Sequence, residues 1–514
     1  MNILYVIRDM SFIEPLGVMF LSAIGRREGH RSALAIINEE DVLARIERDR
    51  PDLVCMSVMS VDADVFERLA RDIRDRRPEI RIIVGGPHVT FELDRTRAWP
   101  IDAAVQGEAD GAFRDLIRAI DAGQPFDHLE NVNTATRTNP MRRLNDALDE
   151  LPHPDRELVY FPGGHLAGLN VKSFMASRGC AYRCTYCFNS KLNELYRGKG
   201  RPVRRFSVEY LLEEIERVRR DYGFTFIRFG DDVFAYGVDD WLLEFAEKYP
   251  RRVGVPYYCL VRPNLLKKDL VEVLRRSGCH SISLSIEAGS ERLRREVLLR
   301  RMEDAVILDA FRNVHQAGIH VYANAMFGLP NATTEDEIET VELAARCRPA
   351  YPSFTVFTPF RGTTLGEQCA RQGLIDGDYP AHTTDRSMLN CFTEREKDIQ
   401  INLVHLSIFA IRFPFLKDLV LKRLIRLQPN PVFFFAWYLM KNYVSARYIW
   451  PIQGGVLTKA RLALRALAFE LSGRLSLRRL LGRRARRPAS REVSDQQPVF
   501  PRSGPMFEDP AVLS

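Results

Sequence analysis

Three cysteines lie within eight consecutive positions, at Cys180, Cys184 and Cys187. Three thiolates on one short loop can hold a 4Fe-4S cluster and leave one iron open, and an open iron can chelate an amino group and a carboxylate. Structural zinc is the alternative, but zinc sites of this kind pair two cysteine motifs or add histidine, and the sequence has no second motif. The spacing therefore favours an iron–sulfur cluster over zinc or three unrelated thiols.

Charged residues follow apolar, strand-like runs at several later points of the chain. Asp232 and Glu287 carry carboxylates that can accept hydrogen bonds from an amino group or a ribose, and Arg262 can pair with a carboxylate. Each stands just after an apolar run, where the carboxyl ends of barrel strands present reactive groups. The alternative is that these charges only cap loops at a solvated rim.

An alternation of apolar runs and helical patterns from Lys172 to about Phe360 must position these residues. Six strand and helix pairs predict a partial barrel of the TIM type. In one of the helices, Thr334 and Glu337 are spaced as a capping box. The predicted strands are Ser173–Ala176, Phe224–Phe229, Val255–Val261, Ser281–Ile286, Ile319–Phe327 and Phe354–Phe357.

With these motifs the chain resembles the radical S-adenosylmethionine superfamily. The superfamily's CxxxCxxC motif matches the three cysteines, and the likeness continues through the strand ends to Gly328-Leu329-Pro330. The resemblance implies a 4Fe-4S cluster, S-adenosylmethionine as cofactor, and an external electron donor such as flavodoxin or ferredoxin. The residues expected to contact S-adenosylmethionine are Tyr186, Asp232, Arg262, Ser285 and Glu287.

The first part of the chain, to about residue 122, has its own alternation of short apolar runs and helical patterns. This rhythm predicts an α/β domain of flavodoxin (Rossmann-like) type, with a parallel sheet between two layers of helices. Gly85, Gly86 and Gly107 follow two of the runs, where small residues can admit a flat ligand at the carboxyl edge of the sheet. The predicted strands are Ile3–Ile7, Leu34–Ile37, Leu53–Val58, Ile80–Val84 and Ala103–Val105.

This part resembles the cobalamin-binding domain that precedes the barrel in a large radical S-adenosylmethionine subfamily. The resemblance implies cobalamin contacts at Gly85, Gly86 and Gly107, with Ser57 and Ser60 along the nucleotide tail. Many cobalamin domains carry a cobalt-binding histidine after the first strand, but here Ser11 stands at that position. We therefore expect cobalt without a protein histidine below it, the alternative being a degenerate domain that is kept only for packing.

Five regions are expected along the chain. Residues 1–122 form the cobalamin-binding domain, and the proline- and glycine-rich residues 123–170 form a linker that packs between domains. The radical S-adenosylmethionine barrel spans 171–385 and a helical region spans 386–475. The basic tail, 476–514, is predicted to be disordered.

Composition limits the class of protein and its partners. The 514 residues are 46% hydrophobic and 27% charged, which suits two or three globular domains. Part of the net charge of +7 comes from a late arginine-rich segment, so a basic tail explains it better than nucleic-acid binding. Nine cysteines and no secretory signal predict reduced thiols in the cytoplasm.

The C-terminal region raises the question of a membrane. The apolar run Pro431–Met440 is about half of the ~20 residues that a membrane-spanning helix needs. Val456–Leu471 interleaves basic and apolar residues, and the arginine-rich segment follows it. The pattern predicts peripheral contact of residues 455–491 with the inner membrane face, the alternative being a helical lid that packs on the barrel.

Two cofactor domains in one chain predict transfer of a methyl group to an unactivated carbon of a small-molecule or lipid-like substrate. The runner-up is an oxidative ring closure or rearrangement, as in the anaerobic magnesium-porphyrin cyclase that the chain also resembles. A methylthiotransferase would need a cysteine triad in the first domain, where only Cys55 occurs. A non-catalytic, cluster-binding sensor is the alternative from another functional class.

Overall fold

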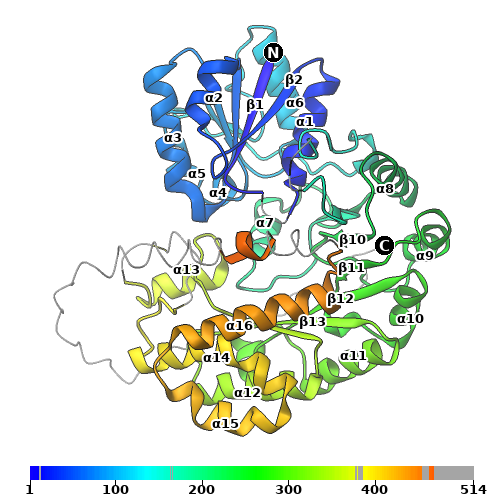
Figure 1. The fold of residues 1–514 in the computed structure, drawn as a ribbon. Coiled ribbons are helices and arrows are strands. Elements are labelled where there is room, and N and C mark those ends of the chain that lie inside the picture. The colour runs from blue at the N-terminus through cyan, green and yellow to red at the C-terminus, as the bar shows by residue number, and fades with distance from the viewer. Residues whose placement is uncertain are drawn as a thin grey trace.

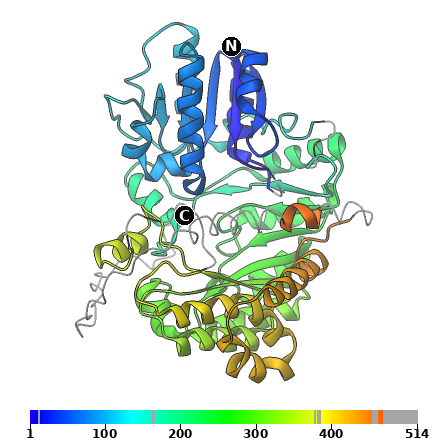
Figure 2. The same cartoon turned by 60° about the vertical axis from the view of Figure 1, so that its left-hand side comes forward.

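The fold is that of a computed structural model, which describes residues 1–10, 13–161, 164, 166–376, 379, 386–453 and 462–467. Two six-stranded sheets dominate it, each covered by helices (Figures 1 and 2). In Figure 1 the first sheet lies above, the second sheet forms the open barrel below, and three C-terminal helices lie along the lower front.

The first sheet has the strand order β2-β1-β3-β4-β5-β6, and β1 to β5 run parallel in the flavodoxin arrangement. The sixth strand, β6, pairs antiparallel with β5 and comes from the segment predicted as a linker. The strands are β1 (Asn2–Ile7), β2 (Arg31–Ile36), β3 (Leu53–Ser57), β4 (Arg81–Gly85), β5 (Ala103–Val105) and β6 (Val132–Asn133).

Helices cover both faces of this sheet because alternate strand residues are apolar on each side. One face packs against α1 and α6, and the other against α2 and α3 together with the short α4 and α5. The helices are α1 (Leu16–Arg27), α2 (Val42–Asp49), α3 (Ala63–Arg76), α4 (Pro87–Phe91), α5 (Leu93–Arg97) and α6 (Asp110–Asp121).

The second sheet is a six-stranded parallel barrel that stays open between β14 and β7. The observed strands lie within three residues of the predicted ones. Two short strands beside it, β8 (Ser177–Arg178) and β9 (Arg204–Arg205), pair antiparallel. The barrel strands are β7 (Val171–Phe174), β10 (Phe226–Phe229), β11 (Tyr257–Leu260), β12 (Cys279–Glu287), β13 (His320–Phe327) and β14 (Tyr351–Val356).

The sequence of β13 shows how a strand serves both the core and the interior of the barrel. Its alternate residues from Val321 to Phe327 are buried under the outer helices, whereas Tyr322, Asn324 and Met326 stay partly exposed. Asn324 donates to the Ser283 hydroxyl on the neighbouring strand at 2.8 Å. The interior face is therefore less buried than the core face and carries one polar amide, at Asn324.

The helices around the barrel follow its strands in turn. The capping box of α12 is formed by Thr333 and Asp336, so the predicted pair, Thr334 and Glu337, was wrong by one residue. Glu337 points inward instead and is buried. The helices are α7 (Phe188–Leu195), α8 (Val208–Tyr222), α9 (Asp240–Arg252), α10 (Lys268–Arg276), α11 (Asp304–Gln316), α12 (Thr334–Cys347) and α13 (Thr364–Arg371).

Three further helices follow in the C-terminal region, α14 (Glu394–Arg412), α15 (Lys417–Lys422) and α16 (Pro431–Val444), and residues 462–467 are also helical. The first packs against β14 and α12, and the third packs on the first. No helix in the described ranges is long and apolar enough to cross a membrane. Short helical turns occur at η1 (Ser60–Asp62), η2 (Leu148–Glu150), η3 (Pro263–Leu265), η4 (Leu293–Val297), η5 (Pro414–Leu416), η6 (Leu424–Arg426) and η7 (Ser445–Ile449).

A buried polar contact joins the two sheets on the β7 side. Glu14, in the loop after β1, accepts hydrogen bonds from the Tyr160 hydroxyl at 2.8 Å and the Ser173 amide at 3.2 Å. Arg228 on β10 lies 3.6 Å from the same carboxylate. The loop that leaves the first sheet is thus fixed against the barrel wall.

Candidate cluster and cofactor site

The three cysteines lie on one loop between β8 and α7. Gly179 begins the loop at φ +84°, and any side chain there would collide with the Pro202 carbonyl, so only glycine fits. Thr185 fixes the middle of the loop, since its hydroxyl donates to the Val297 carbonyl at 2.7 Å. Cys187 is the N-cap residue of α7, which carries the chain away from the loop.

The three thiols are close enough to interact electrostatically, but their sulfur atoms do not surround a common point. Cys180 and Cys184 are buried and Cys187 is partly exposed, and both of the others interact electrostatically with Cys187. Burial raises the pKa of Cys180, and that of Cys187 to about 12. Among the described residues, no three His, Cys, Asp or Glu side chains already surround a common point. In number and chemistry, the three thiols suit a cluster that binds thiolates and releases their protons.

A network at the end of β12 joins two of the predicted cofactor residues to one that the sequence did not indicate. Tyr186 donates to Glu287 at 2.6 Å, and Arg300 approaches the same carboxylate at 3.5 Å. Arg300 also donates to the Ser285 carbonyl at 2.7 Å. Glu287 and Arg300 are buried, and Glu287 has φ +66°, which is unusual for a residue other than glycine. The charge of Glu287 is therefore balanced by Arg300 within the protein.

Arg262 has spare hydrogen-bonding capacity close to the cluster loop. Its guanidinium lies 3.8 Å from the centre of the Tyr182 ring, and its buried Nε has no hydrogen-bond acceptor among the described residues. Burial and the neighbouring charge of Arg300 lower the pKa of Arg262, although Cys184 partly offsets them. A buried cation with an unsatisfied donor suits the carboxylate of a bound small molecule.

The two adjacent aspartates after β10 have different environments. Asp231 is buried and accepts hydrogen bonds from the Ser177 hydroxyl and the Ala176 amide at 3.1 Å. Burial raises the pKa of Asp231 to about 6, and the Ser177 bond opposes that rise. Asp232 is exposed, yet partial desolvation raises its pKa against a hydrogen bond with Asn189. Asp231 thus supports the loop, and the exposed Asp232 is the one that a ligand can reach.

Glu337 connects the end of β13 to the C-terminal helices. Its carboxyl accepts from the Gly328 amide at 2.8 Å and from Gln400 of α14 at 3.0 Å. Burial raises the pKa of Glu337 to about 8, against the effect of both hydrogen bonds. The Gly328-Leu329-Pro330 turn is therefore held in place by a carboxyl group that the sequence pattern assigned to a helix cap.

The predicted cobalamin residues all lie at the carboxyl edge of the first sheet and are partly exposed: Ser57, Ser60, Gly85, Gly86 and Gly107. Gly86 has φ +99°, and an added Cβ would lie 2.9 Å from the backbone N and O of Val58. An added Cβ at Gly107 would collide with the Tyr196 hydroxyl. Both glycines are thus required by the protein's own packing, in addition to any ligand. Accessible small residues at this edge suit a flat cofactor.

The two histidines of the first domain are both buried. His30 Nδ1 lies 3.1 Å from the N-terminal amine, and the buried His88 stacks on Trp99. Ser11, which stands where some cobalamin domains have a cobalt-binding histidine, lies outside the described residues. His88 Nδ1 has no hydrogen-bond partner among the described residues, but the imidazole is buried and does not face the edge.

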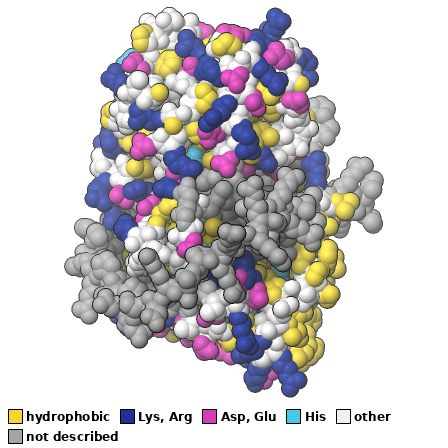
Figure 3. All heavy atoms as spheres, turned by 90° about the vertical axis from the view of Figure 1, so that its left-hand side faces the viewer, with side chains coloured by type: hydrophobic (Ala, Val, Ile, Leu, Met, Phe, Trp, Pro, Cys, Tyr) yellow, Lys and Arg dark blue, Asp and Glu magenta, His cyan; other side chains and the backbone are white. Residues whose placement is uncertain are grey.

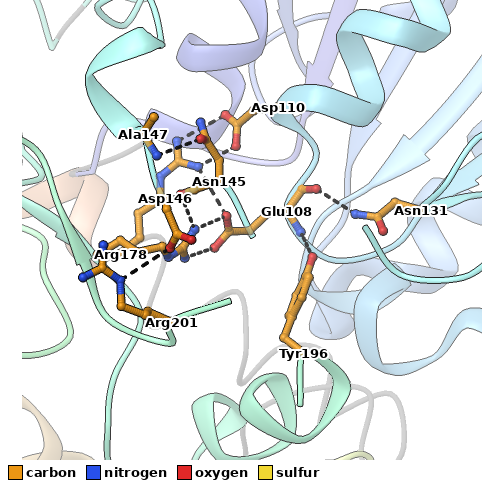
Figure 4. Close-up of polar contacts among 10 residues, drawn as sticks. Glu108, Asp110, Asn131, Asn145, Asp146, Ala147, Arg178, Tyr196 and Arg201 are labelled. Atoms are coloured by element: carbon orange, nitrogen blue, oxygen red, sulfur yellow. Dashed lines mark hydrogen bonds and ion pairs between the residues drawn. The ribbon is translucent and has the colours of Figure 1, made fainter. Parts of the chain in front are cut away.

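Ion pairs join the β5 end of the first sheet to the start of the cluster loop (Figure 4). Arg178 donates to Asp110 at 2.5 Å, and Arg204 donates to both oxygens of Glu108, at 2.8 and 2.5 Å. The Glu108 amide donates to the Tyr196 hydroxyl at 2.7 Å, just beyond the end of α7. The cluster loop and the first sheet's edge are therefore neighbours.

Family comparisons agree with this geometry. Residues 4–117 match the B12 binding domain, and residues 175–344 match the radical SAM superfamily, where SAM denotes S-adenosylmethionine. A B12-binding domain followed by a radical SAM domain defines a class of enzyme. The chain belongs to the cobalamin-dependent radical SAM enzymes, whose cofactors are a 4Fe-4S cluster, S-adenosylmethionine and cobalamin.

Individual relatives are distant. An uncharacterised methyltransferase of Pyrococcus horikoshii is 26% identical over 435 residues, covering 80% of this chain and 92% of the relative. An anaerobic magnesium-protoporphyrin IX monomethyl ester cyclase of Cereibacter sphaeroides is 25% identical over 363 residues, covering 65% and 56%. The solved structure of the cobalamin-dependent radical enzyme OxsB has a TM-score of 0.64 at 16% identity, covering 86% of this chain and 71% of that one. It shares the fold.

Proposed function

We propose that this enzyme methylates an unactivated carbon of a small-molecule or lipid-like substrate. The observation that carries the proposal is the placement of the cysteine loop beside the carboxyl edge of the first sheet, so that two cofactors serve one reaction space. When bound, the cluster supplies an electron for the cleavage of S-adenosylmethionine, and cobalamin supplies the methyl group.

The protein's own residues have three tasks in this proposal. Cys180, Cys184 and Cys187 hold the cluster and leave one iron open. Arg262 binds the carboxylate of S-adenosylmethionine, and Asp232 accepts hydrogen bonds from its amino group or ribose. Positioning in a water-excluded space does the rest, because hydrogen abstraction from carbon needs no protein base or nucleophile.

The end of β12 takes a positioning role. Glu287 and Tyr186 line the S-adenosylmethionine site together with Ser285, whose carbonyl is held by Arg300. Since Arg300 balances the charge of Glu287, this carboxylate meets the cofactor as a fixed acceptor and adds little net charge. Support comes from the burial of both groups.

For cobalamin we propose contacts at Gly85, Gly86 and Gly107, with Ser57 and Ser60 beside the nucleotide tail. The cobalt has no protein histidine below it. An electron spin resonance spectrum of the cobalt(II) form should lack nitrogen superhyperfine splitting from a protein imidazole. Such splitting would refute this assignment.

Methyl transfer has a distinctive stoichiometry. One S-adenosylmethionine gives 5'-deoxyadenosine after taking a hydrogen atom from the substrate, and a second one restores the methyl group and gives S-adenosylhomocysteine. Turnover of a co-produced metabolite with methyl-deuterated S-adenosylmethionine should add one labelled methyl to the product. Formation of 5'-deoxyadenosine without label or S-adenosylhomocysteine would favour ring closure, to which the similarity to the cyclase gives some weight.

The proposed setting is the cytoplasm, with an external flavodoxin or ferredoxin as electron donor and no nucleic-acid partner. We also propose peripheral contact with the inner membrane face. Residues 455–491 lie outside the described chain except for 462–467. Support comes instead from α16, where Val432, Phe435, Leu439 and Tyr443 form one stripe with exposed fractions between 47% and 72%. Hydrophobic side chains gather on this lower side in Figure 3, towards the right.

Flotation with anionic vesicles tests the membrane contact. A Phe435→Ser/Leu439→Ser variant should float less than the wild type, and so should a chain without residues 455–491. Leu243→Ser, at an exposed leucine of α9, is the matched control and should float normally. Equal flotation of all the variants would contradict the proposal.

A further inference from the structure

We propose that a basic face beside α7 is the docking site of an acidic electron-carrier protein, with a flavin or iron–sulfur centre, that reduces the cluster. The inference rests on the proposed function, because it names the surface through which the electron donor of that reaction acts. Beyond the proposed function, the inference assigns the residues of the docking site and predicts that the carrier is negatively charged.

The centre of this face is a cavity of about 270 Å³ between the first domain and the residues that follow α7. Four arginines line it: Arg27, Arg114, Arg142 and Arg143. Its three acidic residues are Glu108, Asp110 and Glu150. The first two of these pair with Arg204 and Arg178 of the barrel (Figure 4), and Arg114 and Arg142 both pair with Asp115. With these partners included, six arginines face four carboxylates, so an excess of positive charge remains.

The segment after α7 continues the basic surface. Residues 197–205 contain five arginines and lysines and no acidic residue. Lys199 donates to the Met141 carbonyl at 2.6 Å, and Arg201 lies 3.7 Å from Asp146. These contacts place the segment directly beside the cavity's arginines, so the two parts form one continuous face.

Two arginines of this face have no side-chain partner among the described residues. Arg143 and Arg197 are exposed, and neither side chain forms a hydrogen bond or ion pair with a described residue. Exposed, unpaired charges of one sign do little for stability, but they attract a partner of opposite sign and speed its encounter.

The position of the face suits electron transfer to the cluster. Arg178 lies two residues before Cys180, and α7 runs from Cys187 to the cavity-lining Tyr196. Nine residues at ~1.5 Å each place Tyr196 roughly 13 Å along the helix from Cys187. A carrier seated here is therefore separated from the cluster by one helix.

The test uses the reconstituted full-length enzyme and a bacterial flavodoxin as the probe, with binding measured under anaerobic conditions by calorimetry. An Arg143→Glu/Arg197→Glu variant should bind at least tenfold more weakly than the wild type at low salt. Wild-type affinity should fall steeply with added salt, because the charges that attract the carrier are exposed. The matched control is Arg68→Glu/Arg276→Glu, which makes the same charge change at exposed arginines of α3 and α10 and should bind normally.

A second measurement separates docking from the state of the cluster. Formation of 5'-deoxyadenosine should fall in the double variant when flavodoxin, its reductase and NADPH supply the electrons, and stay unchanged when dithionite does. Unaltered flavodoxin affinity in the Arg143/Arg197 variant, or equal weakening in the control variant, overturns the docking site. If dithionite produces no 5'-deoxyadenosine in the wild type, the proposed function fails, and the binding data still decide the docking site on their own.

Discussion

The candidate sites at the ends of the two sheets consist of different kinds of residue. At the end of β12 the barrel uses large charged and aromatic side chains that hold one another, such as Glu287, Tyr186 and Arg300. At the end of β4 the first sheet has glycines instead of large side chains, and at Gly86 the absence of a Cβ allows the backbone of Val58 to approach closely. The difference teaches that one edge depends on charge pairing and the other on backbone shape, so each should fail in its own way.

The largest expected effect is loss of the barrel's cluster while the first domain keeps its function. Cys184→Ala should abolish the visible absorption of the cluster and all formation of 5'-deoxyadenosine. Two thiolates are too few to bind a 4Fe-4S cluster that needs three protein ligands. Cobalamin binding to the first domain should persist. Cys391→Ser, at an exposed cysteine outside the loop, is the control and should keep full iron content. Full iron in the Cys184 variant would contradict the cluster assignment.

A smaller effect tests whether charge pairing holds the end of β12. Arg300→Ala leaves Glu287 buried without its cation, which should cost about 3–5 kcal/mol of stability. Denaturant unfolding of the cluster-free protein measures that loss, and equilibrium dialysis should show weaker binding of S-adenosylmethionine. Arg301→Ala changes an exposed neighbour and should do neither. Equal stability of the two variants would mean that the pairing is unimportant.

The first sheet's edge should respond to a single methyl group. Gly86→Ala places a side chain at φ +99° and ψ −174° and against the backbone of Val58, at a cost of roughly 2–3 kcal/mol. Cobalamin binding should weaken while iron content stays normal, the reverse of the Cys184 result. Gly17→Ala, where an added Cβ meets nothing within 4 Å, should be harmless. Thermal unfolding and cobalamin titration together give the answer.

The smallest effect concerns pH and sharpens the role of Glu337. Its pKa of about 8 in the folded protein lies above the unfolded value, so the folded state holds a proton that the unfolded state has lost. Stability should therefore fall as pH rises from 6 to 8, by about 2 kcal/mol from this group. Glu337→Gln should remove that part of the slope. An unchanged slope in the variant would show that Glu337 is ionised when buried.

Much of this fold follows from local patterns, because buried parallel strands are short apolar runs. The strand Ala103–Val105 was predicted to the residue, and the order of the first sheet follows from its flavodoxin rhythm. The strand β6 escaped prediction because its two residues lie in a proline-rich segment and pair only through tertiary contact. The capping box was misplaced because Thr333 and Thr334 both have an acidic residue three positions on.

The candidate site was predictable in its residue types and not in its partners. Cysteine spacing indicates a cluster wherever the loop lies, and the positions of Asp232 and Glu287 after apolar runs indicate a strand-end site. Arg300 gave no such signal, because it lies beyond a π-helical turn and reaches Glu287 only after folding. Likewise, the role of Gly107 depends on Tyr196, far away in sequence.

The helix α7 limits how this architecture can vary. Cys187 caps its start, and Tyr196 at its other end touches Gly107 and the Glu108 amide. One inserted residue would turn Tyr196 by about 100° around the helix axis and move it ~1.5 Å along that axis, which would break the contact with the first sheet. Insertions and deletions between 188 and 195 should therefore be rare among homologues. The distance between the cluster loop and the edge of the first sheet is then fixed, and we expect substrates of different size to be accommodated by changes in the side chains between them.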